Sequence, residues 1–133
     1  MKKLLIVLLI MFAFFANSQV RLGYTSYEIK KEYSALGYTV NSGYGDDGYL
    51  FYSINFSDVV CFYSFGKDDI CTMCIILPKT SERVNGLSEK YNSKYTIISD
   101  SHWKAYMEGG SIADITLQYT KEYGYFFMWV AKN

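Results

Sequence analysis

The sequence has a single proline and a single histidine, and neither sign of charge is in excess. Its 13 basic and 13 acidic residues are scattered along the chain. The basic stripe typical of nucleic-acid binding is therefore missing, and we expect no nucleic-acid partner. EF-hand, P-loop and G-x-S-x-G motifs are also missing, and one histidine cannot build a multi-histidine metal centre. We therefore expect no cofactor and no metal.

Cysteine is scarce as well: Cys61, Cys71 and Cys74 are an odd number, so at least one thiol has no disulfide partner within the chain. Cys71 and Cys74 form a C-x-x-C pattern inside the apolar run 70–77, which is typical of a strand. Residues three apart on a regular strand point to opposite faces. A redox-active C-x-x-C motif instead places its first cysteine at a helix N-terminus. The pattern argues against a redox or metal role.

Apolar residues are abundant at the start of the chain. Two lysines precede an unbroken apolar run over residues 4–15. Ala16 and Ser18 then supply the small residues that favour cleavage before Gln19. The run is shorter than the roughly 20 apolar residues of a membrane-spanning helix. We therefore predict that residues 1–18 are a cleavable signal peptide.

The expected mature protein, residues 19–133, is a single α+β domain. No cysteine precedes Cys61, so a lipid-attachment cysteine at the cleavage site is missing. We predict a soluble periplasmic or extracellular protein that is not lipid-anchored. Its only predicted membrane contact is through the signal peptide before cleavage.

Two segments have the sequence pattern of a helix start, 55 residues apart. Thr25 and Glu28 match a capping box, and Gly37 is a natural helix stop. Thr80 or Ser81 can cap the second helix. The predicted helices are 26–36 and a second that ends near residues 92–93.

Runs rich in β-branched and aromatic residues occupy most of the remaining chain. Their short connections predict an antiparallel meander, whereas the composition of residues 41–48 predicts a loop. The predicted class is α+β, an antiparallel sheet of about six strands with two amphipathic helices on one face, in the order α-β-β-β-α-(β)-β-β-β. The second half repeats the element order of the first, which permits an internal duplication. The predicted strands are 49–55, 59–65, 70–77, 103–107, 112–119 and 125–131, with a short β-prone run at 95–98.

The length of the turn after Gly66 decides which residues lie opposite the cysteines on the neighbouring strand. If Gly66 faces Asp69 across a two-residue turn, Cys61 lies directly opposite Cys74, where a cross-strand disulfide can form. A register shifted by one residue exchanges the faces of one strand. The alternative to the disulfide is a pair of buried free thiols.

The last predicted hairpin pairs residues 112–119 with 125–131. One of its faces is wholly apolar, and the other, called here the mixed face, carries both polar and aromatic residues. Pairing Tyr119 with Phe126 places the apolar face against the helices. On the mixed face, aromatic side chains stand among polar neighbours, where they can stack on sugars or enter a protein partner. The alternative is that loops or another subunit cover this face. The predicted partner-binding residues are Tyr125, Phe127, Trp129, Thr116 and Gln118.

Three further features each have two interpretations. A turn at Gly109–Gly110 places Trp103 on the mixed face, but the amphipathic pattern favours a buried Trp103. His102 could assist a cysteine or serine nucleophile, and a solvated turn histidine is the simpler interpretation. The aspartate pairs 46–47 and 68–69 match turn residues better than a metal site.

The segment Gly23-Tyr24-Thr25-x-x-Glu28-Ile29, closed by Gly37, resembles the G-x-T-x-x-E-[IV]…G opening of the β-lactamase-inhibitor-protein-like and outer-membrane-assembly lipoprotein group. The resemblance implies a small exported bacterial protein that packs helices on antiparallel strands and binds other proteins. This chain departs from the group in having three predicted strands directly after one helix and no lipid-bearing cysteine. The resemblance transfers no site residue.

These features together predict an exported non-enzymatic binding module for a protein or glycan partner. A self-associating structural domain, forming a homo-oligomer through a sheet edge or face, is the second hypothesis. A cysteine-dependent enzyme is the third.

Overall fold

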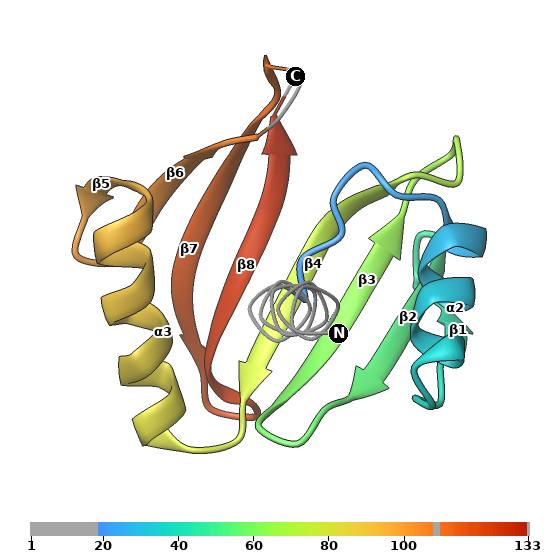
Figure 1. Cartoon of the computed structure of the whole chain (residues 1–133), viewed down its shortest axis with the longest axis horizontal. Helices are drawn as coiled ribbons and strands as arrows, with labels where there is room; N and C mark the ends of the chain where they lie inside the picture. Colours follow the sequence, from blue (N-terminus) through green and yellow to red (C-terminus); the bar gives the residue numbers. More distant parts are fainter. Residues whose placement is uncertain (1–18, 108–109, 133) are drawn as a thin grey trace, which may run out of the picture.

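The computed structural model describes residues 19–107 and 110–132, so the predicted signal peptide lies outside the described residues. Two helices, α2 (Ser26–Ala35) and α3 (Ser81–Lys94), lie on one face of an open antiparallel sheet (Figure 1). The sheet has eight strands in the order β1-β2-β3-β4-β8-β7-β6-β5. This is the α+β class expected from the sequence. The strands are β1 (Asn41–Tyr44), β2 (Leu50–Asn55), β3 (Val59–Phe65), β4 (Cys71–Pro78), β5 (Thr96–Ser99), β6 (His102–Tyr106), β7 (Ile112–Thr120) and β8 (Gly124–Lys132).

The two edge strands explain why the sheet is larger than the predicted six strands. β5 forms where the short β-prone run was noted, but β1 forms in a segment predicted as a loop. Gly43 suits β1 because a Cβ atom at this position would lie 2.7 Å from Cζ of the Phe51 ring. The glycine that suggested a loop therefore allows the edge strand to lie close to an aromatic side chain.

Both helices begin as their sequences predict. Thr25 is the N-cap of α2 and forms a complete capping box with Glu28. Thr80 is the N-cap of α3, and its side chain accepts a hydrogen bond from the backbone N–H of Arg83. Gly37 has a φ of +91°, the left-handed conformation of a helix stop that favours glycine. Neither described helix is long and apolar enough to cross a membrane.

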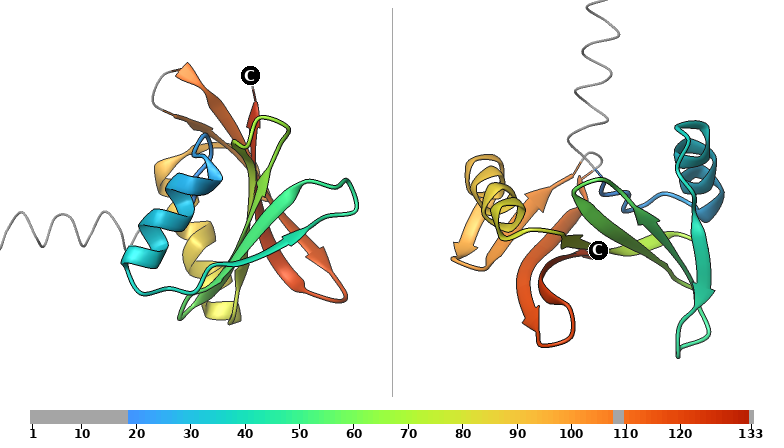
Figure 2. Two further views of the ribbon diagram at one scale, coloured as in Figure 1. Left: turned by 90° about the vertical axis from the view of Figure 1, so that its right-hand side faces the viewer. Right: turned by 90° about the horizontal axis from the view of Figure 1, so that it is seen from below.

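The two halves of the chain have the same architecture. Each half is one helix followed by four antiparallel strands, and the last strands of the halves, β4 and β8, pair at the centre of the sheet. Figure 2 shows both helices on the same side of the sheet. The strand order is therefore symmetric about the β4–β8 pair, which favours the internal-duplication hypothesis.

Aromatic side chains fill the core between the helices and the sheet. In the first half, Tyr33 of α2 packs edge-on against Phe56 and contacts Tyr63. In the second half, Tyr91 of α3 contacts Tyr95 and three aromatic residues of the sheet at ring-centroid distances of 5.1 to 5.7 Å. These three residues are Trp103, Phe127 and Trp129.

The prediction that Trp103 is buried is confirmed. Its exposed fraction is 0%, and its indole Nε1 donates a 2.8 Å hydrogen bond to Oδ1 of Asn92 on α3. Its neighbours on β6 point the other way: Lys104 is half-buried and Tyr106 is exposed. The amphipathic pattern thus predicted the face better than the proposed glycine turn did.

The segment directly after the predicted cleavage point lies between the two helices, on the helix side of the sheet (Figure 1). Its backbone bonds to the start of β4 through the N–H of Gly23 and the carbonyl of Cys71. The buried Arg21 forms an ion pair with Glu32 of α2 at 2.6 Å. The backbone carbonyl of Gln19 accepts a 2.6 Å hydrogen bond from the Tyr63 hydroxyl. The first residues of the predicted mature chain therefore complete the core.

Candidate functional site

The predicted exposure of Phe127 and Trp129 is wrong. The β7–β8 hairpin turns through three residues, 121–123, so Thr120 faces Gly124. The predicted pairing of Tyr119 with Phe126 required an even number of turn residues, and a shift of one residue exchanges the faces of β8. Phe127 is 0% exposed and Trp129 is 2% exposed. Both side chains pack under α3 and belong to the core.

The other predicted partner-binding residues are divided between the two faces. Thr116 is half-buried and Gln118 is exposed, both on the face without helices. Tyr125 is 54% exposed but shares its face with the buried Phe127 and Trp129. It lies at the hairpin end and packs against Tyr119 with ring centroids 4.9 Å apart. The predicted set therefore does not form one surface.

The sheet face opposite α2 and α3, called here the helix-free face, has an apolar centre. Strand β3 alternates strictly between fully buried and half-buried residues. Phe62 faces Ile75 on β4, and Ile75 faces Met128 on β8, so three apolar side chains form a row across the sheet. A second row, formed by Met73 and Val130, runs parallel to it. The central apolar residues are Phe51, Phe62, Met73, Ile75, Met128 and Val130.

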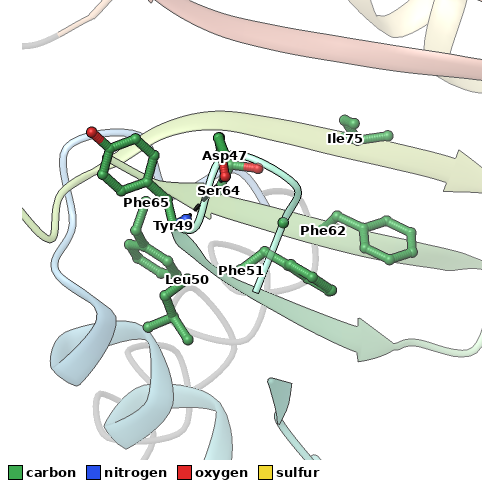
Figure 3. Close-up of a pocket in the computed structure, with 9 residues that line it drawn as sticks. Asp47, Tyr49, Leu50, Phe51, Phe62, Ser64, Phe65 and Ile75 are labelled. Carbon is green, nitrogen blue, oxygen red and sulfur yellow. Dashed lines mark hydrogen bonds between the residues drawn. The ribbon is translucent and has the colours of Figure 1, made fainter. Parts of the chain in front are cut away.

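A groove of about 260 Å³ opens at the β1–β2 end of this face (Figure 3). The side chains of Phe51, Phe62 and Ile75 line it from three strands. The loop between β1 and β2 contributes Asp47 and Tyr49 to its lining. Oδ1 of Asp47 accepts a 2.9 Å hydrogen bond from the backbone N–H of Tyr49, which orders this loop. Because most of the lining side chains are apolar and the Asp47 oxygen is already hydrogen-bonded, the groove is largely apolar.

A charged cluster lies at the opposite end of the helix-free face. Oδ1 of Asp114 on β7 lies 2.9 Å from Nε2 of His102, and Oδ2 lies 2.6 Å from Nζ of Lys132. Hydrogen bonds with Lys132 and His102 lower the pKa of the Asp114 carboxyl group. Sequence reasoning missed this cluster because its members come from three strands whose register was unknown. His102 begins β6 and is half-buried, so the turn assignment was wrong.

We expect Asp114→Asn to remove a stabilising interaction that depends on pH. A lowered pKa in the folded state means that the carboxylate stabilises the fold above its unfolded-state pKa, and that this contribution is lost as the pH falls through the folded-state pKa. The wild type should therefore melt at a higher temperature than the variant at pH 7, and the difference should shrink as the pH falls below the unfolded-state pKa of about 3.9. Thermal unfolding of both proteins from pH 2 to pH 7 measures this. A difference independent of pH would contradict the assignment.

The predicted pairing of Cys61 with Cys74 is also wrong. The β3–β4 hairpin places Cys61 opposite Ile76 and Cys74 opposite Tyr63. Two features cause this shift: the turn is longer than two residues, since the backbone N–H of Gly66 bonds to the carbonyl of Ile70, and the register shifts once more between Phe65 and Ser64. Cys61, Cys71 and Cys74 are all buried, and none of them forms a disulfide bond in the structure.

The buried cysteines are not arranged as nucleophiles. Burial raises the pKa of the Cys61 thiol to about 12, and burial together with Cys71 raises that of Cys74. A neutral thiol is a poor nucleophile. His102 lies on the helix-free face, whereas the cysteines face the helices, so the sheet separates them. The described residues therefore do not bring together the groups that a cysteine-dependent enzyme requires.

Within residues 19–107 and 110–132, no three or more His, Cys, Asp or Glu side chains form a group that could hold a metal ion. Comparison of the chain with protein-family models, curated proteins and solved structures returns no match.

Proposed function

We propose that this chain is an exported, non-enzymatic binding module that holds a protein partner on its helix-free face. The observation that carries the proposal is the apolar row of Phe62, Ile75 and Met128, which ends in the groove and is covered by neither of the two described helices. A hydrogen-bonded sheet packed on a buried core is a rigid platform for such a surface. These three side chains are half-buried, so part of their apolar surface stays open to solvent, and apolar surface gathered in one place is typical of an interaction site.

A protein suits this surface better than a glycan. The apolar centre is bordered by polar and charged side chains, among them Thr116, Asp114 and Lys132, and this arrangement is typical of protein interfaces. Sugar binding requires several convergent hydrogen-bonding groups beside the aromatic rings. In the groove, Oδ1 of Asp47 already accepts a hydrogen bond from the loop backbone. We therefore infer a partner that inserts apolar side chains between Phe51 and Phe62.

The proposal predicts where the partner can be crosslinked. A photo-crosslinking amino acid placed at position 62 in the exporting cell should form an adduct with another protein. The same group at Tyr27, which is 69% exposed on α2, should not form that adduct. Mass spectrometry of the adducts measures both results. Equal labelling from both positions, adducts only with a second copy of this chain, or the absence of protein adducts from position 62 would overturn the proposal.

A substitution in the groove tests the same site independently. Phe51→Ser combined with the crosslinker at position 62 should reduce the adduct about tenfold or more, because residues at the centre of an interface contribute most of the affinity. The matched control is Tyr44→Ser on the neighbouring edge strand, where the side chain is 76% exposed. Equal adduct yields from the two variants would contradict the proposed groove.

A further inference from the structure

Strand β4 has a β-bulge beside the β3–β4 turn. Ser64 faces Met73, but the next residue, Phe65, faces Cys71, so one residue of β4 is extra at this point. The extra residue shifts the alternation of side chains along the strand. Cys71 and Cys74, expected on opposite faces, therefore both point into the core.

The bulge brings the two sulfur atoms into contact. The Sγ atoms of Cys71 and Cys74 lie 3.6 Å apart, and each residue is 1% exposed. A disulfide bond requires an S–S distance of about 2.05 Å, so the sulfurs need to approach by roughly 1.5 Å. Cys61 faces the same core but lies opposite Ile76, two residues further along the β3–β4 ladder than the Tyr63–Cys74 pair. Cys71 and Cys74 are thus the pair that the fold holds together.

We propose that Cys71 and Cys74 are oxidised to an intrachain disulfide when the chain is exported, and that Cys61 stays a free thiol. The proposal rests on the export inferred above, because disulfides form and persist in oxidising compartments. The proposal accounts for the odd number of cysteines, because two of them form the disulfide and the third stays a buried thiol.

The oxidant is an external disulfide, either a disulfide-bonded thiol oxidoreductase or oxidised glutathione. One cysteine, as the thiolate, attacks this disulfide, forms a mixed disulfide and releases the first external thiol. The second cysteine loses its proton and attacks the mixed disulfide, releasing the second external thiol. Two cysteine thiols are oxidised by two electrons, and one external disulfide is reduced to two thiols.

The burial of the pair sets the order of events. In the folded chain both thiols are almost inaccessible, so an external disulfide cannot reach them. The reaction therefore takes place while β4 is still exposed during folding. Once formed, the bond closes around the bulge that determines the register of β3 against β4.

Peptide mapping separates this pairing from every other. Trypsin cuts after Lys67 and Lys79, so the peptide 68–79 carries both Cys71 and Cys74, and Cys61 lies in a different peptide. The exported protein is unfolded and alkylated with iodoacetamide without reductant. We expect peptide 68–79 to be unalkylated and about 2 Da lighter than its reduced form, and the Cys61 peptide to carry one label. Two labels on peptide 68–79, or a link between the two peptides, would overturn the proposal.

Two controls distinguish a failure of the disulfide from a failure of export. The chain without residues 2–18, kept in the reducing cytosol, should give two labels on peptide 68–79. Cys61→Ser, exported in the same way, should keep the 2 Da difference in that peptide. If no processed chain beginning at Gln19 leaves the cytosol, export itself is wrong. Refolding of the reduced chain with oxidised glutathione then tests the pair alone, and failure to form the 68–79 bond there would overturn the pairing.

Discussion

Trp103→Ala is expected to lower the free energy of unfolding by about 3–5 kcal/mol, the usual cost of deleting a large buried aromatic side chain. The indole is 0% exposed and contacts the ring of Tyr91 at 5.7 Å and that of Phe127 at 6.0 Å. Alanine would leave a cavity beside these rings. It would also leave the side-chain oxygen of Asn92 without its indole donor.

Tyr106→Ala is the matched control for this prediction. Tyr106 lies on the same strand but is 69% exposed, so its truncation should change the free energy of unfolding by about 0.5 kcal/mol or less. Guanidinium unfolding of both variants measures the difference, provided that the denaturant slope is unchanged. Equal destabilisation by the two substitutions would contradict the register of β6 and, with it, the assignment of the helix-free face.

The second large effect is expected from Arg21→Ala, at about 2–3 kcal/mol of destabilisation. Removing one partner of a buried ion pair leaves the other charge without compensation, and the effect is reduced here because the Glu32 side chain is 23% exposed. The guanidinium also lies 5.2 Å from the centre of the Tyr33 ring. Its loss would therefore loosen the segment after Gln19 from α2.

Arg83→Ala is the control for the ion pair. Arg83 lies 2.7 Å from Asp58, but the two side chains are 32% and 42% exposed, and Nε is not aligned for a hydrogen bond. Exposed pairs of this kind contribute about 0–1 kcal/mol. Thermal unfolding in low and high salt should show a small effect for Arg83 that salt reduces. A loss at Arg83 as large as that at Arg21 would contradict the special role of the buried pair.

Local chemistry explains which features the sequence could predict. The helix starts depend on neighbouring residues, such as Thr25 with Glu28, and both starts are confirmed. The burial of Trp103 followed from the alternation of a single strand. The α+β class followed from the order of the elements and their short connections.

The facing of side chains across strands depended on turn lengths that composition does not encode. A three-residue turn before Gly124, in place of an even number of residues, moved Phe127 and Trp129 into the core. A longer turn and a bulge on β4 separated Cys61 from Cys74 and brought Cys71 to Cys74. Each error was a shift of one or two residues, and a shift of one is enough to exchange the two faces of a strand.

The sequence by itself determined the two helix starts, most of the strands and the apolar character of those strands, because these depend on contacts between near neighbours in the chain; the edge strand β1 was missed. Only the tertiary structure decided that Phe127 and Trp129 are covered by the helices and that Phe51 and Phe62 line the open groove. It also decided which two of the three thiols touch. These outcomes depend on pairing between strands distant in sequence, where turn geometry and a single bulge set the register.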